Sequence, residues 1–194
     1  MPKNTSVEIL GLHLSPRKKG SSRLLLDKFK EGAESKGARF EILSVSDLRI
    51  KGCVGCFSCT KDGKCVIKDD DMRVLYEAWE KAERVVVSTS IYFYDMPSQG
   101  KAVLDRSQAF WARRYELHQN KEDKPGGRGF LLAVGATKGK ELFTPVTLVV
   151  KYLFDSLSIS KKFPVLAFRG VEGPDKFTSE QLEEVVKAGE EFAG

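Results

Sequence analysis

Apolar segments of strand character alternate with amphipathic segments along the chain, and this alternation most constrains its fold. Strands are predicted at 6–14, 38–45, 84–90, 130–136 and 161–170. Apolar residues recur at helical spacing between and after them, at 23–37, 69–83, 100–118, 142–158 and 178–194. Strands that alternate with helices predict βαβ units, in which helices cover both faces of a mostly parallel sheet.

Parallel crossovers have a preferred hand, which leaves few topologies for five such strands. Right-handed connections favour the strand order 2-1-3-4-5, that of a flavodoxin-like three-layer α/β sandwich. With 194 residues, of which 41% are hydrophobic, the chain has enough apolar mass for one core. Because the sequence shows no linker or internal repeat, we expect a single domain over 1–194, with a cysteine-containing loop at 50–67.

Charge and hydropathy argue against several classes of protein. Lys and Arg number 32 against 27 Asp and Glu, and the net charge of +5 is mixed along the chain rather than gathered in one stripe. This argues against a nucleic-acid partner and mildly favours an anionic ligand such as phosphate. No apolar run approaches the roughly 18 residues that span a bilayer, and the amino terminus lacks a signal-peptide pattern. We therefore expect a cytoplasmic protein without a membrane partner.

The loop after the first predicted strand is a candidate anion site, because ligands of such sheets bind beyond the carboxyl ends of the strands. Its sequence is SPRKKGSS, with Ser15, Arg17, Gly20, Ser21 and Ser22. Hydroxyls, a guanidinium and the N–H groups of a helix start suit a phosphate monoester, such as that of a mononucleotide. The alternative is a solvated basic turn in which Ser21 or Ser22 is an ordinary helix N-cap.

Two further loops are expected at the same edge of the sheet. The loop that follows the strand at 84–90 carries hydroxyls and aromatic rings, which could hold a planar ring system. The alternative is that these rings plug the end of the core. A turn of small residues follows the strand at 130–136. The candidate residues of the two loops are Thr89, Ser90, Ile91, Tyr92, Phe93 and Tyr94, and Gly135, Ala136 and Thr137.

All four cysteines lie in one short segment with the spacing C-x2-C-x2-C-x5-C. They are Cys53, Cys56, Cys59 and Cys65. Four thiolates in so compact a loop can enclose one metal core, and the spacing favours an iron-sulfur cluster. Structural zinc more often uses two CxxC pairs that are further apart, and disulfides are rare in a reducing cytosol. Zinc and free or disulfide-bonded thiols remain the alternatives.

These motifs resemble those of the iron-sulfur flavoproteins, within the flavodoxin-like NAD(P)H-dependent FMN reductases. The resemblance rests on Ser15-Pro-Arg17 with Gly20-Ser21-Ser22, on the cysteine loop through Asp70, and on Tyr92-Phe93-Tyr94 with Pro97 and Lys101 to Arg106. It covers nearly the whole chain, with the motifs in the expected order. It implies FMN held by the loops after the first, third and fourth strands, and a four-iron four-sulfur cluster on the cysteines. It also implies a homodimer or homotetramer that brings a cluster near a neighbouring flavin.

The resemblance also implies a role for each matching residue. Ser15, Arg17, Ser21 and Ser22 would bind the FMN phosphate, although Ser22 stands where the family usually has Asn or Thr. Thr89 through Tyr94 and Gly135 through Thr137 would line the ribityl chain and the ring. The four cysteines would be the cluster ligands. No side chain is expected to be catalytic, because the chemistry belongs to the FMN.

Three functions follow as hypotheses. The first is a redox protein that passes electrons between FMN and the cluster, to or from a ferredoxin-like partner or a small acceptor. The second is an NAD(P)H-dependent FMN, quinone or nitro-compound reductase without a functional cluster. The third is a non-catalytic redox sensor. The two histidines, His13 and His118, lack nearby ligands at metal spacing and are interpreted as structural.

Overall fold

The computed structural model describes residues 7–120 and 122–194, so Ser6, the first residue of the predicted first strand, lies outside the described residues, as does the start of the expected domain. Five parallel strands form one sheet in the order β2-β1-β3-β4-β5, which confirms the predicted topology. The strands are β1 (Glu8–His13), β2 (Arg39–Ser44), β3 (Arg84–Ser90), β4 (Arg128–Gly135) and β5 (Val165–Arg169).

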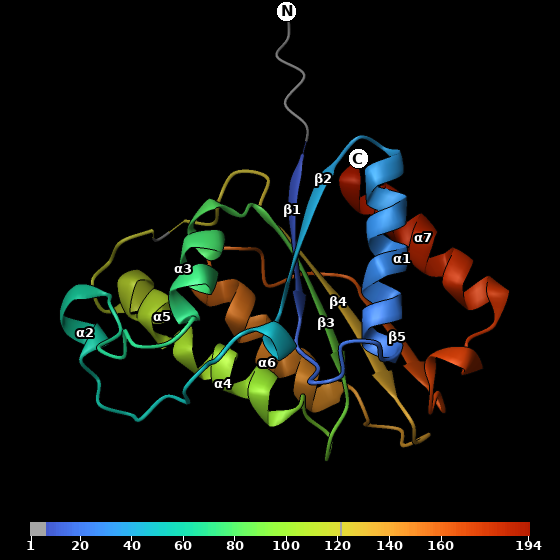
Figure 1. Ribbon diagram of the computed structural model, residues 1–194. Helices are drawn as coiled ribbons and strands as arrows, with labels where there is room; N and C mark the ends of the chain where they lie inside the picture. Colours follow the sequence, from blue (N-terminus) through green and yellow to red (C-terminus); the bar gives the residue numbers. More distant parts are fainter. Residues whose placement is uncertain (1–6, 121) are drawn as a thin grey trace, which may run out of the picture.

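One face of the sheet is covered by α1 (Ser21–Ser35) and α7 (Ser179–Ala193), which lie side by side (Figure 1). Their apolar residues pack with Ile9, Val86 and Phe130 of the sheet. Glycines allow the two helices to approach closely: a Cβ on Gly32 would lie 1.9 Å from the carbonyl oxygen of Val186. A capping box starts α7, in which Thr178 and Gln181 are bonded to each other's backbone N–H groups.

The other face is covered by α3 (Met72–Lys81), α4 (Ser98–Arg106), α5 (Gln108–Tyr115) and α6 (Thr144–Ser156). A short helix, α2 (Cys59–Asp62), lies outside this layer in the cysteine loop, beside α5 (Figure 1). Two short 3₁₀ helices, η1 (Val45–Asp47) and η2 (Pro174–Lys176), complete the elements. Within the described residues, no helix is long and apolar enough to cross a membrane.

The single helix predicted at 100–118 is wrong, because the chain breaks at Ser107 into α4 and α5. The carbonyl oxygen of Arg106 accepts a hydrogen bond from the Tyr76 hydroxyl at 3.0 Å. The Ser107 N–H turns to the carbonyl of Leu104, and the Phe110 N–H turns to that of Ser107. These tighter i to i+3 bonds replace the α-helical ladder at the break.

Candidate functional site

The carboxyl ends of β1, β3 and β4 meet at one edge of the sheet, at the bottom of Figure 1, and the predicted FMN-binding loops follow them there. A hydrogen bond of 3.1 Å joins the Ser90 hydroxyl to that of Ser15 and so ties the first loop to the second. The Ile91 N–H donates to the carbonyl of Val134 at 2.9 Å, which ties the second loop to β4. The structure therefore brings the three loops together.

The first loop turns the start of α1 toward this edge of the sheet. Gly20 is the N-cap of α1 and no side chain caps the helix, so the alternative with Ser21 or Ser22 as N-cap is wrong. The first N–H groups of α1 have no intrahelical acceptor, which makes the helix start suited to an anion. Arg17 is exposed beside it. A phosphate bound here would meet backbone donors and a guanidinium.

Two of the predicted phosphate ligands already have partners. The Ser15 hydroxyl is buried and bonds to Ser90. The Ser22 hydroxyl is buried too and lies 3.1 Å from Nε2 of His13, whose Nδ1 lies 2.8 Å from the Ser44 hydroxyl. Ser22 is therefore placed to meet a phosphate with its backbone N–H rather than its hydroxyl. His13 is buried and hydrogen-bonded on both sides, which confirms it as structural.

The second loop forms a tight two-residue turn. Tyr92 and Asp95 exchange backbone hydrogen bonds, while Phe93 and Tyr94 have φ angles of 50° and 67°. Two successive residues of positive φ are typical of a type I′ turn, which turns their side chains outward here. The rings of Tyr92, Phe93 and Tyr94 are exposed, Phe93 fully so, which rules out the alternative that they plug the core. These rings remain accessible to a planar ligand.

The third loop is held between β5 and the aromatic turn. Gly135 and Thr137 accept backbone hydrogen bonds from Val171 and Gly170, which follow β5. Gly135 is buried, whereas Ala136 and Thr137 are exposed. The Tyr94 hydroxyl lies so near Gly139 that a Cβ there would be 3.1 Å from it. A side chain larger than hydrogen at Gly139 would require the Tyr94 hydroxyl to shift by a few tenths of an ångström.

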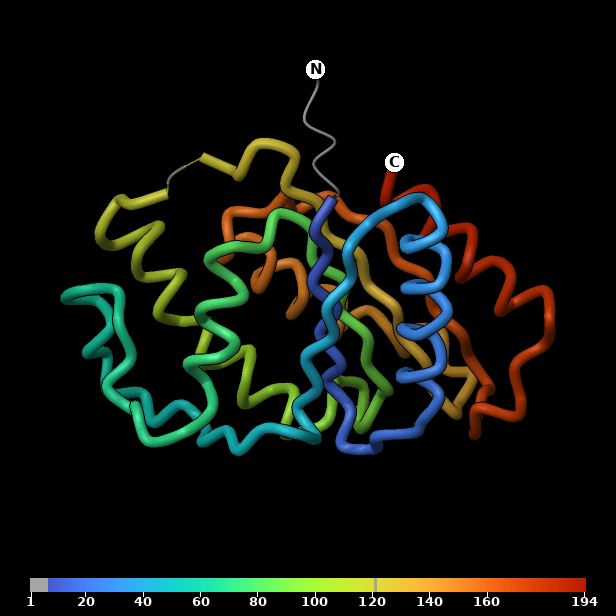
Figure 2. The backbone as a smooth tube through the Cα atoms, turned by 45° about the horizontal axis from the view of Figure 1, so that its top comes forward, coloured from blue at the N-terminus to red at the C-terminus, as the bar shows by residue number. Residues whose placement is uncertain are grey.

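The cysteine segment leaves the carboxyl end of β2 and lies at the edge of the molecule beside α3 and α5 (Figure 2). All four cysteines line one cavity of about 300 Å³, which we call the four-thiol cavity. None of them is in a disulfide. Gly55, Phe57 and Gly63 have φ angles between 56° and 72°, the left-handed turns that wrap the chain around the cavity. Among the described residues, no three His, Cys, Asp or Glu side chains converge as the ligands of a single metal ion do.

The thiols influence one another electrostatically. Burial raises the pKa of Cys59, and the charges of Cys65, Cys53 and Cys56 raise it further. Hydrogen bonds from Ser58 lower the pKa of Cys56. When ionised, the four thiolates around the cavity repel each other, and a cationic metal group between them would relieve that repulsion.

Arg106, which sequence reasoning used only as part of a family motif, closes the base of the cysteine segment. Its Nη1 donates to the carbonyl of Lys51 at 2.9 Å and its Nη2 to that of Ile67 at 3.0 Å, one at each end of the segment. The carboxylate of Asp70 accepts hydrogen bonds from both nitrogens. The side chains of Arg106 and Asp70 are only 1% and 2% exposed. Burial opposes the ionised form of each group, but their mutual hydrogen bonds raise the pKa of Arg106 and lower that of Asp70. The pair stays charged.

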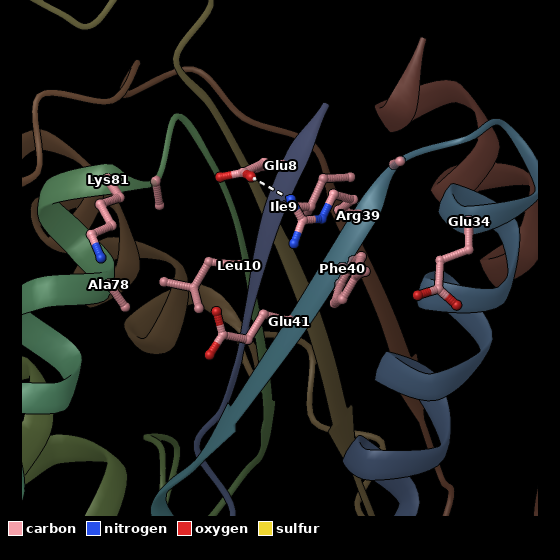
Figure 3. Close-up of a pocket in the computed structure, with 11 residues that line it drawn as sticks. Glu8, Ile9, Leu10, Glu34, Arg39, Phe40, Glu41, Ala78 and Lys81 are labelled. Carbon is pink, nitrogen blue, oxygen red and sulfur yellow. Dashed lines mark hydrogen bonds and ion pairs between the residues drawn. The ribbon is translucent and has the colours of Figure 1, made fainter. Parts of the chain in front are cut away.

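Another cavity, of about 630 Å³, lies at the opposite, amino ends of β1 and β2 (Figure 3). Its polar lining includes the exposed ion pair of Glu8 and Arg39, and also Glu41 and Lys81. The cavity is remote from the carboxyl ends of the strands and from the cysteines. We therefore assign it no part in the site.

The buried His13 predicts a dependence of stability on pH. Burial, followed by the charge of Arg23, lowers the pKa of His13 from 6.5 to about 4. Between these values the unfolded chain binds a proton that the folded chain does not, so stability is lost as the pH falls from 6.5 toward 4. From pH 7 to pH 5, urea unfolding should show the protein losing on the order of 2 kcal/mol more than a His13→Gln variant. The exposed His118 provides the control, because His118→Gln should keep the full loss. If the unfolding free energies of all three proteins fell equally between pH 7 and pH 5, the lowered pKa of His13 would be contradicted.

Comparison with known proteins agrees with this geometry. The chain matches the family described as NADPH-dependent FMN reductase over residues 7–141. An iron-sulfur flavoprotein of Archaeoglobus fulgidus is 34% identical over 136 residues, which are 69% of this chain and 66% of the relative. One from Methanocaldococcus jannaschii is 29% identical over 132 residues, 68% of this chain and 64% of the relative. The matches thus span just under two thirds of the length of these curated relatives.

Solved structures share the fold. An NAD(P)H:quinone oxidoreductase from Methanothermobacter marburgensis superposes with a TM-score of 0.72 at 16% identity, covering 98% of both chains. An FMN-dependent NADH-azoreductase from Bacillus anthracis gives a TM-score of 0.66 at 15% identity, covering 96% of this chain and all of the other. Identities this low speak for the flavodoxin-like fold alone. The family match carries the assignment further: the chain belongs to the NADPH-dependent FMN reductase family, and it is similar within it to the iron-sulfur flavoproteins.

Proposed function

We propose that the protein is a flavin-dependent oxidoreductase that passes electrons between a bound FMN and a four-iron four-sulfur cluster, to or from a ferredoxin-like partner or a small acceptor. One observation carries the proposal: a chain of an FMN reductase family gathers all four of its cysteines around one cavity. The similarity to proteins named iron-sulfur flavoproteins supports the same assignment.

The three loops at the carboxyl edge of the sheet would hold the FMN. Backbone N–H groups at the start of α1, with Arg17, would bind the phosphate. The exposed rings of Tyr92 to Tyr94 would lie against the flavin ring, while the turn at Gly135 to Thr137 would contact its polar edge through backbone groups. The burial of Ser15 and Ser22 gives these residues a different part, which is to keep the loop in shape through Ser90 and His13.

Cys53, Cys56, Cys59 and Cys65 would be the cluster ligands. Iron-sulfur clusters bind through four thiolates, and four thiols line the cavity. Burial raises the pKa of Cys59 and the charges of the other three cysteines raise it further, which fits a site made for a cationic metal group. Zinc on the same four thiols is the rival occupant, and analysis for iron and zinc distinguishes the two.

When bound, FMN takes two electrons as a hydride from a donor such as NAD(P)H, and the cluster carries one electron at a time, so one donor molecule reduces two one-electron acceptors. The chain itself positions both groups. The helix start and Arg17 orient the FMN through its phosphate, and Arg106 holds the two ends of the cysteine segment. Neither orienting the FMN nor holding the cysteine segment needs a general base. This agrees with the structural role of the buried His13.

The surroundings of the cysteines suit a protein partner. Val54, Phe57 and Val66 are more than half exposed around the four-thiol cavity, so an electron-transfer protein or a second copy of the chain would meet an apolar surface there. Leu148 and Tyr152 of α6 are exposed as well and suit contact between copies. A cytoplasmic homodimer or homotetramer remains part of the proposal.

A second candidate is an NAD(P)H-dependent FMN, quinone or nitro-compound reductase whose cysteine loop has no redox part. The family match favours it, because that family is described by its NADPH-dependent reaction. The fold shared with a quinone oxidoreductase is compatible with it. The two candidates differ in whether electrons reach the four-thiol cavity.

Arg17→Ala tests the phosphate loop. Loss of a charge-assisted hydrogen bond to phosphate costs about 1.5–3 kcal/mol, so the Kd for FMN should rise roughly 10- to 100-fold by calorimetry. Lys19→Ala is the matched control, since Lys19 is an exposed cation of the same loop and should change the Kd less than about twofold. An equal loss of FMN affinity in both variants would indicate general attraction by charge. No loss of affinity in either variant would mean that the FMN phosphate does not bind at this loop.

Cys56→Ser separates the two candidate functions. The variant should lose most of its iron and keep its FMN, because the cysteine segment and the three FMN loops follow different strands. NADPH should still reduce the flavin, whereas electron transfer to a ferredoxin-like acceptor should fall at least about tenfold, measured by anaerobic stopped-flow absorption.

Lys61→Ala is the control for this experiment, as an exposed change in α2 between the same cysteines. The Lys61→Ala variant should keep its iron and its rate of electron transfer to the acceptor. If Cys56→Ser transferred electrons as fast as the unaltered protein, the reductase without a functional cluster would be the better answer.

A further inference from the structure

One nitrogen of Arg106 takes no part in holding the two ends of the cysteine segment. Its Nη1 and Nη2 are taken up by Asp70 and by the carbonyls of Lys51 and Ile67. Its Nε is buried and has no hydrogen-bond partner among the residues that the structure describes. The side chain is 1% exposed, so bulk water does not reach it.

A buried N–H without an acceptor destabilises the folded state, and folded proteins rarely leave one unpaired. Arg106 lines the four-thiol cavity together with the four cysteines. Much of the remaining lining is apolar, including Val54 and Ile67, and the carboxylate of Asp105 is paired with Lys101. The other polar side chain of the lining is Gln108, so the sulfurs of the four cysteines are the most numerous acceptors around this cavity.

We propose that Arg106 is a positioning residue that donates its Nε–H to a sulfur atom of the iron-sulfur cluster held by the four-thiol cavity, and so sets the reduction potential of that cluster. The inference rests on the proposed function, because it needs the cluster. A guanidinium keeps its charge at any physiological pH. A permanent cation and a donor beside the cluster stabilise the reduced state, which carries one more negative charge, and hydrogen bonds to cluster sulfur are among the factors that set such potentials.

Arg113 is a natural comparison for Arg106. It also contacts the cysteine segment, where its Nε donates to the carbonyl of Gly63 at 2.8 Å. Its Nη1 pairs with Glu80. The two arginines thus hold the same segment, but the Nε–H of Arg113 already has an acceptor in the protein. If Arg106 only anchored the cysteine segment, Arg113 would have the same role. A hydrogen bond to the cluster would belong to Arg106 alone.

The first test needs no variant. Protein grown with arginine labelled with ¹⁵N at Nε is purified anaerobically, its iron is counted, and the reduced cluster is examined by pulsed electron paramagnetic resonance. We expect about four irons per chain and one ¹⁵N nucleus strongly coupled to the electron spin. Four irons without that coupling would overturn the hydrogen bond while leaving the proposed function intact. Absence of iron would overturn both, so the two failures are distinguishable.

The second test compares Arg106→Lys with Arg113→Lys. Lysine keeps the charge at position 106 but has no Nε–H, so the ¹⁵N coupling should vanish in Arg106→Lys. At a fixed solution potential the ratio of reduced to oxidised cluster should fall about tenfold, equal to 59 mV for a one-electron couple. Arg113→Lys should keep the coupling and change the ratio less than about twofold. Equal changes of potential in both variants, or none in Arg106→Lys, would contradict the proposal.

Discussion

The buried ion pair of Arg106 and Asp70 is the interaction on which the arrangement of the cysteines depends. The segment between β2 and α3 contributes no strand to the sheet and only the short helices η1 and α2, so side chains must hold it. Arg106 bonds to both of its ends, at Lys51 and Ile67. Removing one partner of such a buried pair costs about 3–5 kcal/mol, because the other charge is left uncompensated. A segment rich in thiols and exposed apolar side chains is thereby kept in one conformation.

The same residue relates the two parts of the proposed site. Helix α4 starts after the aromatic turn and ends at Arg106. Its nine residues span about 14 Å, at 1.5 Å for each residue. One rigid helix therefore separates the rings of Tyr92 to Tyr94, expected beside the flavin, from the base of the cysteine segment. The break at Ser107 belongs to this arrangement, since the Arg106 carbonyl bonds to the Tyr76 hydroxyl there instead of continuing the helix.

The sequence predicted most of the fold because buried parallel strands are continuous apolar runs, and the run at 84–90 matches β3 residue for residue. It missed the break at Ser107, since a hydroxyl distant in the sequence competes for a helix carbonyl and periodicity does not register that. It also missed the role of Arg106, although a signal was present: Arg106 lies three residues after Val103 and four before Phe110, on a buried face where a charge needs a partner. Asp70 lies at the start of the helix predicted at 69–83, and only the fold shows that it meets Arg106. The predicted FMN ligands stay predictions, with Ser15 and Ser22 found bonded within the protein.

We propose that one chain holds a flavin and a cluster that exchange electrons. The sharpest experiment is to purify the protein without exposure to oxygen, to count FMN, iron and acid-labile sulfide per chain, and to follow both absorption bands during reduction with NADPH. We expect about one FMN, four irons and four sulfides per chain, with the cluster band bleaching after the flavin band. Flavin without iron, in protein that never met oxygen, would contradict it and leave an NAD(P)H-dependent flavin reductase.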